Sequence, residues 1–403
     1  MALAGASQLL SSEVSQRRAA VEVVVSRLPQ HWGFLACCGV TELVRALENA
    51  APSAEELRTA SSIGCISPTL ASVLSSAPNA IDVNLAPEGA LLFEGDPIAT
   101  VEGPLWQVWL VVDAVSSVLR ANSVVATRAA RLALASGRGN VVDATSTSAN
   151  HVEGAISIAR SAYIGGAVAT QSPVAAAELG IDLRVSPSSD AVTLSQDDGV
   201  LRNGAWAVQS SADDVVLHLG PGHDEEETLA ELRRLGVGRG SFAARGLARD
   251  ADGLEVRTDL VALEEQGLWS ARLGVMPDPT VNPGRKLLVR YVDRTNRPIA
   301  DVLHSVSERL PPSSEARIVG HNGVMTPSDI EGAVSGVPLL VTMLRSGRRV
   351  GGDDSIDVSR RRLADGLDAV PLPFKRLRYP SRFPVGLSPT LAQLKSELFV
   401  ALA

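Results

Sequence analysis

The middle of the chain alternates between short apolar strands and helices, and this alternation constrains the fold more than any other feature. "GNVVDAT" (139–145) predicts a buried strand, which a helix over 153–161 follows. "PVAAAELG" (173–180) predicts a helix that ends at glycine, and "IDLRV" (181–185) predicts the next strand. Strands and helices interleaved at this spacing favour parallel βα units, either open or closed into a barrel.

The alternation continues toward residue 276. "DDVVLHL" (213–219) and "GSFAARG" (240–246) predict strands, and "DEEETLAELRRLG" (224–236) between them predicts a helix. "LVALEEQGLWSARLGVM" (260–276) is interpreted as a further helix and strand.

The two flanks have a different character, because short β runs are broken there by proline and glycine. They predict a small α+β domain built from both termini. Its expected elements are a strand over 19–29, a helix over 39–50, an antiparallel sheet over 79–104, a buried helix over 105–137, a β-hairpin over 283–306 and a closing helix over 388–402.

Charge and composition exclude several classes of protein. The net charge of −8 argues against a general nucleic-acid binder, and the basic runs near the C-terminus are interpreted as solvated surface. No apolar run reaches membrane-spanning length and the N-terminus lacks signal-peptide character, so no membrane partner is expected. The three cysteines lack metal-ligand spacing and predict small buried side chains in a reduced, cytoplasmic protein.

Four stretches in this order resemble the nicotinate phosphoribosyltransferase family, the type II phosphoribosyltransferases. They are "SRLPQHWGFLACCGVTELVRALENA" (26–50), "PEGALLFEGDPIATVEGPLWQVWLVVDAVSSVLRANSVVATRAAR" (87–131), "ARSAYIGGAVATQSPVAAAELGI" (159–181) and "NPGRKLLVRYVDRTNRPIADVL" (282–303). The resemblance implies an α/β fold with a shortened barrel that need not close, beside the small domain. The implied division is 1–121 for the N-terminal part of the small domain, 122–281 for the degenerate barrel and 282–403 for the return to the small domain.

The resemblance also implies a chemistry, in which the nitrogen of nicotinate attacks the anomeric carbon of phosphoribosyl pyrophosphate and pyrophosphate leaves. Cationic or backbone donors, usually with Mg²⁺, must then surround the phosphates. The family's paired arginines fall on Thr147 and Ser148 of this chain, and its phosphorylatable histidine falls on Ser189. The family's N-terminal tyrosine motif, its Asp turn and its glycine-rich phosphate turn have no counterpart.

The polar loop after the strand ending at Asp143 is therefore interpreted either as a vestigial site or as a rebuilt one. A rebuilt site would bind a neutral polyol or sugar by hydrogen bonds, whereas a strand end under relaxed selection would drift to small polar residues, and we favour the second interpretation. The vestigial or rebuilt cleft comprises Asp143, Thr145, Thr147, Ser148, Asn150, Ser186, Ser189 and Arg128.

Other candidates carry less chemistry. "LHLGPGHDEEETLAEL" (217–232) has the layout of a phosphate cradle, but its acidic first turn would repel phosphate, so a plain helix start is expected. His218 and His223 match no metal signature, and no metal or cofactor is expected. Arg285 and Lys286 are expected to be structural.

Three hypotheses follow. The first is a catalytically inactive homologue that acts as a structural, scaffold or regulatory partner, as a homodimer or with a paralogue or another protein. The second is a phosphoribosyl- or glycosyl-transferring enzyme of NAD or nucleotide metabolism with a rebuilt site. The third is a small-ligand sensor that uses the same cleft without turnover.

Overall fold

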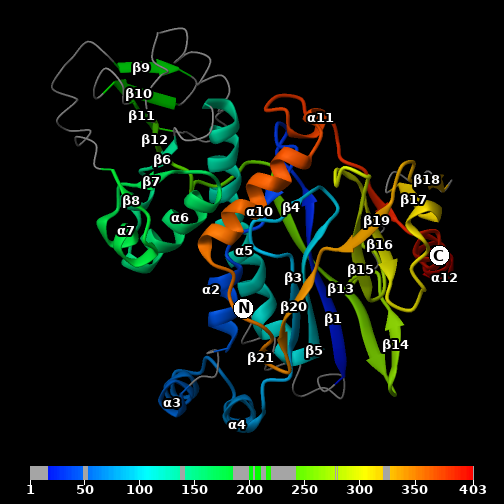
Figure 1. The fold of residues 1–403 in the computed structure, drawn as a ribbon. Helices are drawn as coiled ribbons and strands as arrows, with labels where there is room; N and C mark the ends of the chain where they lie inside the picture. The colour runs from blue at the N-terminus through cyan, green and yellow to red at the C-terminus, as the bar shows by residue number, and fades with distance from the viewer. Residues whose placement is uncertain are drawn as a thin grey trace.

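Three large sheets and the long helix α5 (Leu105–Ser136) organise the molecule (Figure 1). The computed structural model describes residues 17–48, 53–136, 141–184, 199–202, 205–209, 215–218, 242–276, 278, 280–320 and 327–402. The fold is mixed α/β, as the alternation of strands and helices predicts.

The first sheet is antiparallel and collects strands that lie far apart in the sequence. Its order is β14-β13-β1-β5-β3-β20-β21. The strands are β1 (Arg18–Arg27), β3 (Asp82–Leu85), β5 (Pro97–Pro104), β13 (Glu255–Glu265), β14 (Leu268–Ala271), β20 (Val341–Arg345) and β21 (Arg348–Arg349). Because β13 pairs with β1 along its length, the chain has already returned to the small domain's sheet at Glu255.

The helix expected within 260–276 is wrong, because this segment forms the hairpin β13–β14. Gln266 and Gly267 connect the strands with φ of 53° and 80°. Positive φ at both turn residues is the geometry that matches the twist of a two-residue hairpin. The apolar residues of "LVALEE" fit the spacing of a helix as well as that of a strand. The turn and the pairing with β1 select the strand.

The second sheet contains the predicted parallel βα units. Its order is β8-β7-β6-β12-β11-β10-β9. The strands are β6 (Val141–Asp143), β7 (Ala169–Thr170), β8 (Asp182–Leu183), β9 (Gly199–Arg202), β10 (Ala205–Gln209), β11 (Val215–His218) and β12 (Phe242–Arg245). Five strands are parallel, whereas β9 and β10 form an antiparallel hairpin at one edge. Among the described strands, β8 and β9 are the two edges of this sheet and do not pair with each other.

Two helices connect the parallel strands. Helix α6 (Val152–Ile164) follows β6, and His151 caps it because its Nδ1 accepts the Gly154 N–H at 2.9 Å. Helix α7 (Pro173–Leu179) begins after Ser172 and ends at Gly180, whose φ of 65° is the left-handed conformation of a helix C-cap. The predicted helix end at glycine is confirmed.

Helix α5 joins the two sheets. Every residue from Asn122 to Ala133 is buried, whereas its first half keeps an open face on which Trp109 is exposed. By length and composition alone α5 could span a membrane, but the buried core helix of a globular protein meets the same test. Its packing against β1, β5 and α6 makes it a core element here.

The third sheet completes the small domain. Its order is β18-β17-β22-β16-β15-β19. The strands are β15 (Lys286–Val292), β16 (Pro298–Ser305), β17 (Arg317–Gly320), β18 (Ser328–Asp329), β19 (Ser335–Pro338) and β22 (Val385–Leu387). The predicted hairpin is β15–β16, and helix α12 (Pro389–Leu402) packs on this sheet. Helix α10 (Ile356–Ala369) lies between this region and α6 (Figure 1).

The remaining elements are short. They are the strands β2 (Leu35–Ala36) and β4 (Leu91–Leu92), the helices α2 (Val40–Glu48), α3 (Ala54–Ser62), α4 (Pro68–Ser76) and α11 (Leu372–Lys375), and the 3₁₀ turns η1 (Ser146–Ser148) and η2 (Ser313–Glu315).

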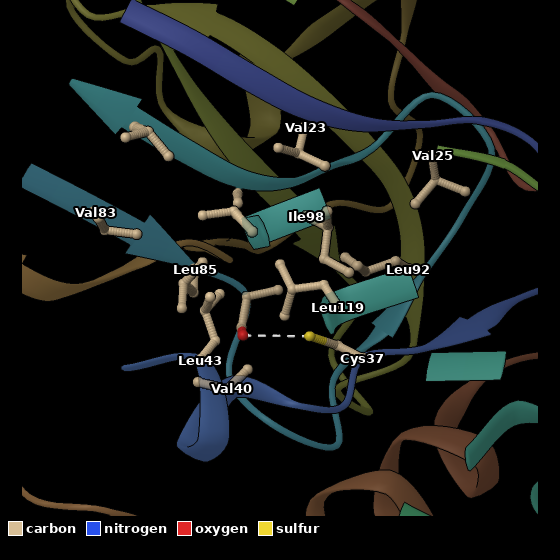
Figure 2. Close-up of a cluster of buried hydrophobic side chains, with 14 of the residues drawn as sticks. Val23, Val25, Cys37, Val40, Leu43, Val83, Leu85, Leu92, Ile98 and Leu119 are labelled. Atoms are coloured by element: carbon tan, nitrogen blue, oxygen red, sulfur yellow. Dashed lines mark hydrogen bonds between the residues drawn. The ribbon is translucent and has the colours of Figure 1, made fainter. Parts of the chain in front are cut away.

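The main core lies between the first sheet and the helices α2 and α5 (Figure 2). Alternate residues of β1, among them Val23 and Val25, point into it and meet Leu119 of α5. Cys37 is buried there, and its Sγ donates to the Ala86 carbonyl at 3.4 Å. Cys38 is buried as well, but Cys65 is exposed after α3, so the prediction that all three cysteines are buried is wrong for Cys65.

Candidate functional site

The carboxyl end of β6 is the first place to look for a site, because sites of parallel α/β sheets form beyond the carboxyl ends of their strands. β6 pairs with β7 on one side and β12 on the other. The loop that follows it, residues 144–151, carries most of the polar side chains that the sequence singled out.

Asp143 ends β6 and is fully buried. Its Oδ1 accepts the backbone N–H groups of Thr145 at 2.8 Å and Ser146 at 3.2 Å, and its Oδ2 accepts the hydroxyl of Thr170 at 2.8 Å. Burial raises the pKa of the Asp143 carboxyl, and the bonds from Ser146 and Thr170 oppose this rise. Both carboxylate oxygens are thus engaged by the loop and by β7.

Thr145 joins the loop to the neighbouring strand. Its hydroxyl donates to the Ala244 carbonyl at 3.0 Å and accepts the Leu247 N–H at 3.1 Å. Thr147 is exposed, and its hydroxyl donates to the Ala144 carbonyl at 2.7 Å. The loop therefore satisfies most of its polar groups internally.

Ser148 and Asn150 are exposed on the same loop. Thr147 and Ser148, the positions on which the resemblance places the paired arginines, are thus solvent-facing hydroxyls. Ser186 and Ser189 lie outside the described residues.

Arg128 lies on α5 and is buried. Its guanidinium donates to the carbonyls of Gly246 at 2.9 Å and Asp250 at 3.0 Å, so it supports the turn after β12. Arg131, one turn later, donates in the same way to the His31 carbonyl at 2.6 Å. Both arginines hold backbone carbonyls of neighbouring segments.

Other sequence candidates have structural surroundings or lie outside the described residues. Arg285 makes a bidentate pair with Glu102 at 2.8 and 2.9 Å, and Lys286 pairs with Glu22. His218 ends β11 with its backbone opposite Arg245, whereas His223 and the helix expected over 224–236 lie outside the described residues.

The two faces of the parallel sheet differ in chemistry. Val141 and Ala244 belong to the face that packs against α5 and α6, which we call the outer face. Ala144 and Ala243 contact each other on the opposite, inner face. Because side chains alternate along a strand, Asp143 shares the outer face with Val141. The carboxylate that the sequence placed at the centre of the site thus points away from the inner face.

The inner face carries two arginines that sequence reasoning missed. Arg245 lies two residues beyond Ala243, and Arg184 lies two residues beyond Asp182, whose register partner is Ala169 of β7. Because side chains two residues apart on a strand share a face, both arginines lie on the inner face, at the carboxyl ends of their strands. Gln171, two residues beyond Ala169 of β7, lies on this face as well. No acceptor among the described residues pairs with its buried amide nitrogen. The signal available was the basic residue that ends "IDLR" and "FAAR".

Helix α6 and its glycine turn form a contrasting region, which we call the α6 seam (residues 152–166). Arg160 is buried and lies 2.6 Å from Glu88, which is 2% exposed. Glu88 also accepts the Gly39 N–H and the Thr41 hydroxyl, each at 2.9 Å. The neighbouring carboxylate and the bonds it accepts raise the Arg160 pKa despite its burial. The seam is thus fastened to α2 and to the loop before β4.

The turn that ends α6 is equally constrained. A Cβ on Gly165 would lie 2.3 Å from the Ala126 carbonyl oxygen of α5. Arg360 of α10 donates to the carbonyls of Tyr163 and Ala167, and its guanidinium lies 4.3 Å from the Tyr163 ring centre. Three helices therefore meet at this turn.

The described residues do not form a metal site. No three His, Cys, Asp or Glu side chains come together in the part of the chain that the structure describes. Asp143, the carboxylate at the end of β6, has both oxygens occupied by protein donors. The residues present at β6 therefore do not fit a catalytic Mg²⁺.

Comparisons with known proteins agree with this architecture. A family model described as the nicotinate phosphoribosyltransferase C-terminal domain matches residues 285–395. The matched residues, 285–395, belong to the C-terminal part of the chain, which is thus similar to nicotinate phosphoribosyltransferases. The crystal structure of human nicotinic acid phosphoribosyltransferase superposes with a TM-score of 0.78 and covers 99% of both chains, at 18% identity.

More distant and more partial matches point the same way. A nicotinate-nucleotide pyrophosphorylase from Pyrococcus furiosus has a TM-score of 0.58 over 91% of this chain and 93% of its own, at 15% identity. These two structures show that the fold is that of the type II phosphoribosyltransferases.

Sequence similarity to curated members of the nicotinate phosphoribosyltransferase family is partial. The Mycobacterium tuberculosis nicotinate phosphoribosyltransferase pncB2 is 29% identical over 163 residues, which is 40% of this chain and 35% of that protein. Nicotinate phosphoribosyltransferase 2 of Arabidopsis thaliana is 32% identical over 145 residues, 34% of this chain and 26% of that protein. The matched stretches thus span about a third or less of these relatives.

Proposed function

We propose that this protein is a nicotinate phosphoribosyltransferase homologue that has lost phosphoribosyl transfer and acts as a structural, scaffold or regulatory partner in the cytoplasm. It would work as a homodimer or in a complex with an active paralogue or another protein. Its place in NAD metabolism would then be to hold or regulate an enzyme.

This proposal rests on Asp143, because both oxygens of its carboxylate already accept hydrogen bonds from the protein. A phosphoribosyl site needs cations and free donors around its diphosphate, because that is where charge develops. At the end of β6 the loop offers Asp143 with both oxygens engaged, and the exposed hydroxyls of Thr147 and Ser148. A neutral hydroxyl supplies none of the charge that an arginine would bring.

The intact α6 seam supports the second half of the proposal. Its buried Arg160–Glu88 pair and the Arg360 contacts stabilise the junction between the barrel and the small domain. Such interactions maintain the fold independently of catalysis, so a chain that keeps them retains surfaces for a partner.

The decisive experiment pairs an activity assay with calorimetry. The purified protein is assayed for nicotinate mononucleotide formation with Mg²⁺, with and without ATP, beside an active family member as positive control. Titration with phosphoribosyl pyrophosphate follows on the same sample. We expect no turnover and no binding of phosphoribosyl pyrophosphate in the micromolar range. Turnover, or micromolar binding of this compound, would overturn the proposal.

The partner claim has its own test. Light scattering coupled to gel filtration gives the mass of the protein alone and mixed with a paralogue from the same genome. We expect either a homodimer or a stable mixed complex. A monomer that binds no paralogue would contradict the partner role.

One observation favours a second candidate, a rebuilt phosphoribosyl- or glycosyl-transferring enzyme or a sensor. Arg184 and Arg245 lie at the carboxyl ends of β8 and β12 on the inner face, where a phosphorylated sugar could bind. Under this alternative, ribose 5-phosphate would bind to the protein and the Arg245→Gln variant would lose that binding. Arg249→Gln, at an exposed position beyond the same strand, is the matched control.

A further inference from the structure

A large cleft lies in the small domain, away from the parallel sheet. It separates β1 and β13 of the first sheet from β16, β17 and β22 of the third, with α12 at one end (these elements are in Figure 1). Its volume is about 1120 Å³. That size is close to the upper end of small-molecule pockets, about 300–1,000 Å³.

The alternation of β1 creates the cleft wall. Val21, Val23 and Val25 enter the core, so Glu22 and Val24 point to the other side of the strand and line the cleft. Opposite them lie apolar side chains of the third sheet and its neighbouring segments, Leu303, Ile318, Phe383 and Val385. The cleft thus has an apolar wall above a charged floor.

Four neutral ion pairs surround the cleft: the more exposed pairs Arg27–Glu255 and Arg382–Glu94, the pair Arg257–Asp259, and Glu22 with the buried Lys286 behind it. Lys286 Nζ lies 3.0 Å from Glu22 and also donates to the carbonyls of Asn282 at 2.6 Å and Gly284 at 2.7 Å. The Arg257 guanidinium holds both oxygens of Asp259, at 2.7 and 2.9 Å. The positive and negative charges of these four side chains cancel.

Lys395 is the exception. It projects from α12 into the cleft, and its Nζ donates to the side-chain oxygen of Asn282 at 2.8 Å. No carboxylate among the described residues forms an ion pair with it. Burial, together with the nearby charges of Lys286 and Arg257, lowers the pKa of Lys395 to about 8, and the carboxylates of Asp278 and Asp259 oppose this fall. An ammonium in these surroundings is stabilised by an added negative charge.

Lysine is rare in this chain, which makes the grouping more informative. Of the 37 basic residues only three are lysines, Lys286, Lys375 and Lys395. Lys395 lines this cleft and Lys286 is buried behind it, paired with Glu22, although 109 positions separate the two lysines in the sequence.

We propose that this cleft binds a small organic monocarboxylate. The carboxylate contacts Lys395 Nζ, and the apolar body lies against Val24, Leu303 and Val385. A monoanion fits best because Lys395 is the one cleft-lining cation among the described residues without an ion-pair partner. The fixed carboxylates of Glu22 and Asp259 would repel the second charge of a phosphate dianion.

The first test uses the lysines themselves. Acylation by acetic anhydride requires the free amine, and mass spectrometry can follow Lys395 and Lys375 separately in the unmodified protein. A bound carboxylate should raise the Lys395 pKa by about one unit, which slows its acylation about tenfold. We expect this protection from millimolar benzoate or hexanoate, no protection from benzamide or hexanamide, and no change at Lys375.

The second test uses calorimetry with benzoate and hexanoate. Lys395→Met should abolish their binding and Lys395→Arg should retain it, with circular dichroism verifying that both variants fold. Equal protection by the amides, protection by inorganic phosphate alone, or no protection by either carboxylate would overturn the proposal. None of these outcomes depends on whether the protein transfers phosphoribosyl groups.

Discussion

The β6 loop and the α6 seam are adjacent in the sequence but differ in what binds them to the rest of the molecule. The loop, residues 144–151, is tied through its own backbone and through Asp143, Thr145 and Thr170. The α6 seam instead contacts α2, α5 and α10 through Arg160, Gly165 and Arg360.

This difference shows how a fold can survive while the end of a strand changes. A substitution at an exposed loop hydroxyl leaves the other contacts intact, so sequence can drift there at little cost in stability. A substitution in the seam leaves a buried charge unpaired or forces two helices apart. The seam is thus constrained by folding, whereas the exposed positions of the loop are not.

The largest effect is expected from Arg160→Met. This change leaves the buried Glu88 carboxylate without its cation, which should lower the free energy of unfolding by about 3–5 kcal/mol. Urea denaturation at pH 7 measures it. The double variant Arg160→Met with Glu88→Gln removes both charges and should recover much of the loss. A loss below about 1 kcal/mol, typical of an exposed pair, would contradict the proposed constraint.

Asp143→Ala should follow, with a loss of about 2–4 kcal/mol, because the N–H groups of Thr145 and Ser146 lose their buried acceptor. Asp143→Asn keeps one carbonyl oxygen and should cost much less. Thermal unfolding of the two variants side by side gives the difference. If Asn were as damaging as Ala, the acceptor role of Asp143 would be refuted.

Gly165→Ala should cost about 1–3 kcal/mol, because the new methyl group meets the Ala126 carbonyl oxygen and forces α5 and α6 apart. Glu153→Ala is the control on the same helix, since the Glu153 side chain is 85% exposed. Denaturant midpoints of both variants test the comparison. A control as unstable as Gly165→Ala would point to the helix as a whole rather than to its contact with α5.

The smallest effect is expected from the double variant Thr147→Arg with Ser148→Arg, which restores the residue types expected from the family resemblance. Both positions are exposed, so unfolding free energy should change by less than about 0.5 kcal/mol. Chemical denaturation measures this. A large loss of stability would show that the loop is constrained by folding after all.

The sequence predicted much of the architecture through local signals. The elements β6, α6, α7 and β8 follow from apolar patterns and the end of α7 follows from Gly180, whereas the two-residue strand β7 was not predicted. It failed at β13–β14, where an apolar run fits both helix and strand periods and pairing with β1 decides. The exposure of Cys65 was likewise invisible to composition.

The candidate site was only partly predictable. The polar residues of the β6 loop were found from their position after a strand, but no local pattern shows that Asp143 points to the outer face. Arg184 and Arg245 were missed because only the pairing of the strands places both on the inner face of the sheet. The same holds for Lys395 and Asn282, which meet at the cleft.

By itself, therefore, the sequence determined the alternation of helices and strands in the middle of the chain, the helix end at Gly180 and the resemblance to a family, since these depend on residues close together in the chain. Only the tertiary structure decided which way Asp143 points, which arginines share the inner face, and that Lys395 has no carboxylate partner among the described residues. The physical reason is that burial and charge pairing depend on distances between segments that the order of residues does not specify.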